Sequence, residues 1–145
     1  MLFTINNGNV PGCPYRQDDI AHLVTTVEDV VAANLPFVFY DYNATLGIAT
    51  PYNQIADLSR IDWPLFFEVP LLGGYCKYWK SDVSKQKYVL RMETRQAEFL
   101  VHASCPLNLV RQIGVSNNAK AAEVTAILQK AGVNIPVAAR PEWYF

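Results

Sequence analysis

A glutamine and a glutamate lie two residues apart in the segment 95–102, which reads Arg-Gln-Ala-Glu-Phe-Leu-Val-His. Its alternation of apolar and polar residues predicts a β-strand over 96–103, with Gln96 and Glu98 on the same face. A carboxylate can stabilise positive charge or accept a proton, and an amide can donate and accept hydrogen bonds. Such a pair suits a cleft that holds a sugar and a base together. The pattern alone, however, favours an ordinary strand with a solvated Glu98.

A second group of chemically useful residues lies just before this segment. The aromatic pair Tyr78-Trp79 is surrounded by cations, namely Lys77, Lys80, Lys85, Lys87, Arg91 and Arg95. Aromatic rings stack on unpaired bases, and Lys and Arg hold phosphates. The alternative is that the rings anchor a loop and the cations are ordinary surface charges. The net charge of −1 gives no general attraction for nucleic acid.

No metal site or common catalytic motif is predicted. The two histidines, His22 and His102, are far apart, and neither has a companion at His-x-x-x-His or Cys-x-x-Cys spacing. The sequence also contains no phosphate-binding loop, no Gly-x-Gly-x-x-Gly fingerprint and no nucleophile elbow.

Composition predicts one globular domain over residues 1–145, since 51% of the residues are hydrophobic and 17% are charged. The three cysteines are widely spaced and the first residues do not form a secretory signal, so we expect a cytoplasmic protein. No membrane span is expected, because Asn34 and Pro36 interrupt the longest apolar stretch, 30–40.

The expected elements do not alternate regularly, which predicts an α+β fold with a mostly antiparallel sheet. We expect strands at 20–27, 37–40, 96–103 and 135–139, short helices at 28–33 and 106–112, and helical turns within 52–58. Ser116 is the expected N-cap of a helix over 117–131, and Gly132 its end. Residues 71–87 are expected to form a long irregular excursion, and the aromatic tail 143–145 to pack back on the domain.

Taken in order, several segments resemble the DarT family, toxins that ADP-ribosylate thymidine in single-stranded DNA with NAD as the substrate. The specific parts are the block 95–102 and the tail Arg-Pro-Glu-Trp-Tyr at 140–144. Weaker similarities lie at 7–10, 22–28, 37–41, 56–58, 61–63, 78–79 and 113–115. The resemblance implies an ADP-ribosyltransferase-like mixed, mostly antiparallel sheet with flanking helices. It also implies a macrodomain antitoxin partner, DarG.

The resemblance assigns roles to particular residues. Glu98 matches the family's catalytic glutamate, which would stabilise the oxocarbenium-like ribose and help to deprotonate the thymine. Gln96 lies where transferases of this fold read the acceptor group. The expected substrate loop carries Tyr78, Trp79, Lys80, Arg91 and Arg95.

The sequence departs from the family in three places. The family has a preceding segment with a His and an Arg that grip NAD, and Met1 matches an internal family position, so we expect a truncated fold, about the C-terminal two-thirds of the family domain. Asn43 stands where the family commonly has a His, and 66–75 resembles an insertion. The leading hypothesis is a DNA ADP-ribosyltransferase. The alternatives are an inactive or fragmentary single-stranded DNA-binding module and a transferase that modifies a protein or an RNA base.

Overall fold

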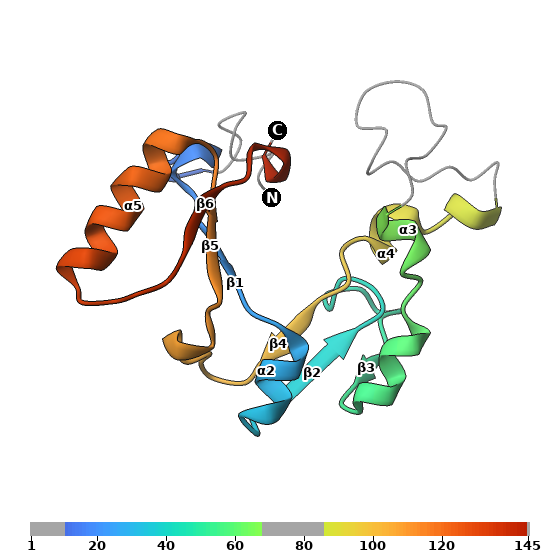
Figure 1. Cartoon of the computed structure of the whole chain (residues 1–145). Helices are drawn as coiled ribbons and strands as arrows, with labels where there is room; N and C mark the ends of the chain where they lie inside the picture. Colours follow the sequence, from blue (N-terminus) through green and yellow to red (C-terminus); the bar gives the residue numbers. More distant parts are fainter. Residues whose placement is uncertain (1–10, 68–85, 145) are drawn as a thin grey trace. The chain divides into compact units, whose positions relative to one another are not determined.

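The structure is a computed structural model that describes residues 11–67 and 86–144. The chain divides into two compact units (Figure 1). Unit 1 comprises Met1–Asn34 and Cys105–Phe145, and unit 2 comprises Leu35–Ser104. Gln96, Glu98 and Asn43 all belong to unit 2. Each unit is described on its own below.

Unit 1 contains a three-stranded sheet in the order β1 (His22–Val24), β5 (Gln112–Val115) and β6 (Val137–Ala139). β5 pairs antiparallel with β1 and parallel with β6, and helix α5 (Asn118–Lys130) lies against β5 and β6 (Figure 1). Ile113 and Val115 of β5 are 4% and 2% exposed and form the core. Short 3-10 helices complete the unit, at η1 (Gln17–Asp19), η4 (Leu107–Leu109) and η5 (Pro141–Trp143).

The central strand β5 was not predicted as a strand. The sequence suggested a helix over 106–112, but only Leu107–Leu109 is helical, and Gln112 already pairs with Val24 of β1. β5 is a four-residue strand with Gly114 in its middle, and glycine weakens a local strand signal. The strand is stabilised by partners from distant parts of the sequence, which a local pattern does not reveal.

Helix α5 begins one residue later than predicted. Its N-cap is Asn117, whose side-chain oxygen accepts a hydrogen bond from the backbone N–H of Lys120 at 3.0 Å. Ser116, the predicted cap, is instead buried, and its hydroxyl accepts a bond from the Asn117 amide at 3.1 Å. Gly132 ends the helix as predicted, with the φ of +67° that favours glycine.

The C-terminal tail packs back on the unit 1 sheet, as predicted. The Trp143 ring lies directly over Gly114, and the Tyr144 hydroxyl donates to the carbonyl of Ile20 at 2.6 Å. His22 meets both rings edge to face, at centroid distances of 5.6 Å for Trp143 and 5.2 Å for Tyr144. The tail therefore packs across β1 and β5 where His22 pairs with Gly114.

An ion pair joins helix α2 (Val27–Ala32) to the residue that precedes β5. The Arg111 guanidinium donates to both carboxylate oxygens of Asp29, and the Thr26 hydroxyl donates to one of them. Thr26 is also the N-cap of α2 and accepts a bond from the backbone N–H of Asp29. The Arg111 guanidinium, and secondarily Thr26, lower the pKa of the Asp29 carboxyl from 3.8 to about 2.

This ion pair predicts a specific acid sensitivity. Because the folded-state pKa of Asp29 lies below its unfolded value, its stabilising effect is present above about pH 3.8 and is lost as the pH falls towards 2. Asp29→Asn should therefore lower the urea midpoint near neutral pH, and the gap to wild type should narrow across that window. Urea titrations at several pH values measure the gap. An equal gap at both ends of the window would show that the Asp29 carboxylate does not stabilise unit 1.

Unit 2 contains a second three-stranded sheet, antiparallel throughout, in the order β3 (Pro51–Tyr52), β2 (Phe37–Tyr40) and β4 (Phe99–Val101). Phe39 is 1% exposed, and its ring stacks on those of Tyr52 and Phe99 at 5.4 and 6.1 Å. Short helices lie between β3 and β4 in the sequence: η2 (Ile55–Arg60), α3 (Pro64–Phe67), η3 (Gln86–Tyr88) and α4 (Arg91–Thr94).

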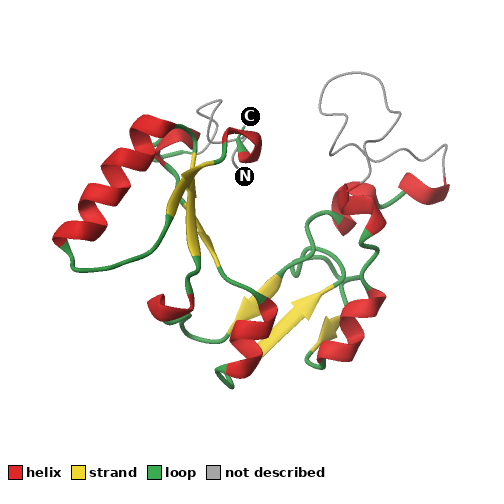
Figure 2. Ribbon diagram, viewed as in Figure 1, coloured by secondary structure: helices red, strands yellow, loops and turns green. Residues whose placement is uncertain are grey.

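The fold class agrees with the sequence prediction. Figure 2 shows helices and short strands mixed in both units, and among the described strand pairs only β5–β6 is parallel. Most of the excursion predicted at 71–87 falls outside the described residues. Within the described ranges, no helix has the length and apolar character needed to cross a membrane.

Candidate functional site

The segment that carries Gln96 and Glu98 is partly turn and partly strand. Helix α4 ends at Thr94, and the backbone N–H groups of Gln96 and Ala97 bond back to the carbonyls of Glu93 and Thr94 at 3.1 and 3.0 Å. The strand β4 spans only Phe99–Val101, so the prediction of a strand over 96–103 was wrong at both ends. Within β4 the predicted alternation is confirmed, because Leu100 is exposed between two half-buried neighbours.

Gln96 is held by Asn43, on the loop that follows β2. The Asn43 side-chain N–H donates to the Gln96 side-chain oxygen at 3.1 Å. The Asn43 side-chain oxygen accepts bonds from the backbone N–H and the hydroxyl of Thr45, at 2.9 and 2.6 Å. Both ends of the Asn43 amide are therefore in use. The Gln96 oxygen faces Asn43, which leaves the Gln96 amide N–H groups for a ligand.

Glu98 lies beside the same loop. Its side chain is exposed, and one carboxylate oxygen accepts a bond from the backbone N–H of Ala44 at 3.4 Å. The backbone carbonyl of Glu98 accepts a hydrogen bond from the backbone N–H of Tyr40 at 2.9 Å, which holds Glu98 just before the start of β4. The structure thus brings the side chains of Gln96 and Glu98 to the loop residues 43–45, which include Asn43. Most of the hydrogen-bonding capacity of the Glu98 carboxylate is left for a ligand.

Asp41 holds the base of this loop. One of its carboxylate oxygens accepts from the backbone N–H of Thr50 at 2.8 Å, and the other from the Tyr52 hydroxyl at 3.3 Å. These bonds close the connection between β2 and β3. Asn43 and Ala44 therefore project from an anchored loop.

The predicted cations differ in their surroundings. Arg91 is 0% exposed, which excludes the alternative that it is an ordinary surface charge, and its predicted phosphate role stays a prediction. Arg95 is partly buried and donates to the carbonyl of Leu65 at 3.2 Å; burial, and secondarily Arg91, lower its pKa. Of the two, Arg95 is the better placed to meet a phosphate. Tyr78, Trp79 and Lys80 lie outside the described residues.

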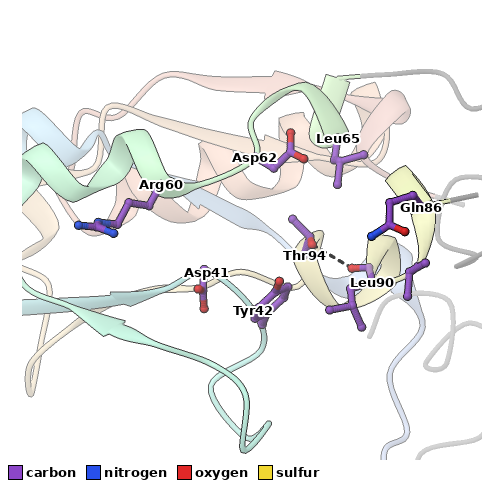
Figure 3. A pocket seen from close by; sticks show the side chains of 9 residues that line it. Asp41, Tyr42, Arg60, Asp62, Leu65, Gln86, Leu90 and Thr94 are labelled. Atoms are coloured by element: carbon purple, nitrogen blue, oxygen red, sulfur yellow. Dashed lines mark hydrogen bonds between the residues drawn. The ribbon is translucent and has the colours of Figure 1, made fainter.

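A pocket of about 300 Å³ lies next to this site in unit 2 and was not predicted from the sequence (Figure 3). Its polar lining consists of Asp41, Tyr42, Arg60, Asp62, Gln86 and Thr94. Its apolar lining consists of Leu65, Val89 and Leu90. The sequence signal that could have indicated the pocket is the polar run Asp41-Tyr42-Asn43, since its first two residues line the pocket and its third is a candidate site residue. No cluster of metal-ligand side chains occurs in the part of the chain that the structure describes.

A protein-family model matches residues 1–145 of the sequence. The matching family is described as "ssDNA thymidine ADP-ribosyltransferase, DarT". A DNA ADP-ribosyl transferase of Thermus sp. (strain 2.9) is 31% identical over 153 residues, with 100% of this chain and 63% of the relative covered. One from Escherichia coli O127:H6 is 26% identical over 145 residues, with 100% and 62% covered. The chain thus spans just under two-thirds of these relatives.

Solved structures show the same similarity. Thermus sp. 2.9 DarT in complex with NAD+ matches with a TM-score of 0.83 at 29% identity, over 99% of this chain and 66% of that one. Its complex with ADP-ribosylated ssDNA gives 0.82 at 29% identity, over 99% and 63%. Thermosipho africanus DarTG in complex with ADP-ribose, at 16% identity, shares the fold alone, with a TM-score of 0.68 over 100% and 33%. The predicted transferase-like α+β fold is confirmed.

Proposed function

The chain belongs to the DarT family, and on that premise we propose that it transfers ADP-ribose from NAD to thymidine in single-stranded DNA. The observation that carries the proposal is the grouping of Glu98, Gln96 and Asn43 around residues 43–45. The relatives are DNA ADP-ribosyl transferases, and the structural neighbours include complexes with NAD+ and with ADP-ribosylated ssDNA. These features support one active site for ribose chemistry and acceptor binding.

Glu98 acts on the ribose in this proposal. The bond between the nicotinamide nitrogen and the ribose breaks, nicotinamide leaves with the electron pair, and positive charge develops on the sugar. The exposed carboxylate of Glu98 stabilises that charge and can accept a hydrogen bond from a ribose hydroxyl. A thymine ring nitrogen then bonds to the ribose carbon and loses its proton, for which the Glu98 carboxylate is the acceptor.

Gln96 binds the acceptor base. Its amide N–H groups are turned away from Asn43 and can donate to a thymine carbonyl oxygen. Asn43 cannot take up a proton as a histidine does, so its role in the proposal is to orient Gln96. In this proposal Glu98 assists the breaking of the bond between nicotinamide and ribose. Gln96, oriented by Asn43, recognises the acceptor base.

The Asn43–Gln96 contact predicts a non-additive effect on DNA binding. Asn43→Ala and Gln96→Ala should each raise the Kd for a thymidine-containing single strand by about 2- to 10-fold, the size of one lost neutral hydrogen bond. The double variant should resemble the worse single variant, because both changes remove the same oriented amide. Asn53→Ala, on an exposed residue of the same unit, is the control. Fully additive losses would show that Asn43 does not act through Gln96.

The direct test is incubation of the full chain with labelled NAD and a single-stranded oligonucleotide that contains one thymidine. The proposal expects label on that strand and none on a strand in which the thymidine is replaced. Label on an added protein or on RNA instead would favour a different acceptor. Label on none of them would contradict the transferase proposal.

A DNA-binding module without transfer is the second candidate. It is favoured by Asn43, whose amide is fully engaged by Gln96 and Thr45 and which stands where the resemblance leads us to expect a histidine. This candidate keeps the acceptor-binding surface but expects DNA binding that is unaffected by NAD. Measured binding with no transfer of label would favour it.

The proposal extends to a toxin role in the cytoplasm, opposed by a macrodomain antitoxin of the DarG type. It is supported by family membership. A purified macrodomain of that type should remove the label from DNA that this chain has modified. Label that persists would contradict the pairing.

A further inference from the structure

The tight turn after β2 sets the orientation of the Asn43 side chain. Its oxygen accepts hydrogen bonds from the backbone N–H and from the hydroxyl of Thr45, at 2.9 and 2.6 Å. The turn is closed by a bond from the backbone N–H of Leu46 to the carbonyl of Asn43 at 3.0 Å. A backbone N–H can only donate, so the end of the Asn43 amide that faces Thr45 must be its oxygen. Thr45 therefore determines which end of the Asn43 amide points to the rest of the site.

This orientation passes from Asn43 to Gln96. With its oxygen held by Thr45, Asn43 turns its N–H groups to Gln96 and donates to the Gln96 side-chain oxygen at 3.1 Å. The reverse arrangement of Gln96 would place two amide nitrogens face to face with no acceptor between them. The Gln96 N–H groups therefore point away from Asn43, and they donate to no residue of 11–67 or 86–144. We call Thr45, Asn43 and Gln96 the amide relay.

Glu98 lies beside the outer end of the amide relay. Its carboxylate is exposed and accepts a bond from the backbone N–H of Ala44, in the same turn, at 3.4 Å. A carboxylate offers acceptors, whereas the outer end of Gln96 offers donors. A donor beside an acceptor is complementary to a base edge on which a carbonyl oxygen lies next to a ring N–H. Thymine carries that edge, whereas cytosine carries an amino group next to a ring nitrogen without a proton.

We propose that Thr45 is a positioning residue that selects the base edge read at this site. It acts through the amide relay, which makes Gln96 present donors and excludes the arrangement in which Gln96 presents its oxygen. The relay favours a base with a carbonyl next to a ring N–H. It disfavours an amino group, which would meet the Gln96 N–H groups. The inference rests on the proposed function for the presence of a base at this site.

The polarity of the relay can be inverted with one substitution. Asn43→Asp keeps the shape of the side chain and an oxygen for the two donors of Thr45, but it places a second oxygen where Asn43 has its N–H groups. Gln96 then has to turn its N–H groups inward and its oxygen outward. Asn53→Asp adds the same charge at an exposed residue of unit 2 and is the control. Thr45→Val removes the hydroxyl donor, and Thr45→Ser retains it.

The test measures binding of single strands to the full chain without NAD, by fluorescence anisotropy. The strands are identical except for one central base, thymine or 5-methylcytosine, which share the methyl group and differ at the edge described above. Wild type should bind the thymine strand about 5- to 100-fold more tightly. Asn43→Asp should favour the 5-methylcytosine strand, and Asn53→Asp should keep the wild-type preference. Thr45→Val should reduce the preference by about 2- to 10-fold, and Thr45→Ser should preserve it.

Equal affinity of wild type for the two strands would overturn the inference, as would an unchanged preference in Asn43→Asp or in Thr45→Val. The outcome is separable from the proposed function, because transfer of label from NAD to the thymine strand is measured in parallel. Transfer by wild type without a base preference that depends on Asn43 would refute the relay and keep the transferase. A preference that Asn43→Asp inverts, without any transfer by wild type, would keep the relay and refute the transferase.

Discussion

Replacing Glu98 by glutamine is expected to reduce the rate of ADP-ribose transfer by at least about 10²-fold, the usual effect of removing one group that stabilises a charged transition state. Glutamine keeps the size of the side chain and can still accept the bond from the Ala44 backbone. It removes the negative charge that the oxocarbenium-like sugar requires and the group proposed to accept the thymine proton. The loss should therefore appear in the chemical step.

Two further measurements identify the cause of that loss. Glu98 is exposed, so Glu98→Gln should unfold at the same urea concentration as wild type and bind single-stranded DNA with unchanged affinity. Glu28→Gln, at an exposed glutamate of unit 1, is the control and should transfer label at the wild-type rate. If Glu98→Gln keeps the wild-type rate, Glu98 is not the catalytic group. If it loses affinity and rate together, its role lies in binding.

The parts of the site predicted from sequence are those encoded by local pattern. The alternation in β4, the neighbouring Gln96 and Glu98, and the family resemblance together indicated which side chains to examine. The role of Asn43 as the partner of Gln96 was not predicted, because the two residues are 53 positions apart in the sequence. A contact of that separation depends on the pairing of β2 with β4, and only the fold shows it.

The missed features share a dependence on tertiary burial. Arg91 reads as a surface cation in a basic segment but is fully buried. Ser116 is a good cap by residue type, but its burial leaves that position to Asn117. The pocket is formed by residues from loops and short helices that have no common periodicity. For Arg91 and Ser116 the residue type was interpreted correctly, but segments distant in the sequence determine how deeply each is buried. The same kind of long-range packing forms the pocket.

Among the glycines in residues 11–67 and 86–144, Gly114 is the one where an added methyl group is expected to destabilise the fold most. A Cβ added at this residue would lie 2.1 and 2.6 Å from two ring carbons of Trp143, much closer than atoms in contact. Gly114→Ala should therefore lower the free energy of unfolding by about 1–3 kcal/mol, the usual cost of overpacking. Gly47→Ala is the matched control, because a Cβ there meets nothing within 4 Å. Urea unfolding of both variants measures the difference.

The cause of this destabilisation can be isolated with Trp143→Ala. That variant loses the ring contact with His22 and should itself be less stable. In its background Gly114→Ala should cost much less, because the clashing ring is gone and the space above β5 can accept a methyl group. An equal cost of Gly114→Ala in both backgrounds would mean that β5 needs glycine for a reason other than the tail. A large coupling would establish that the tail holds unit 1 together by packing on the central strand.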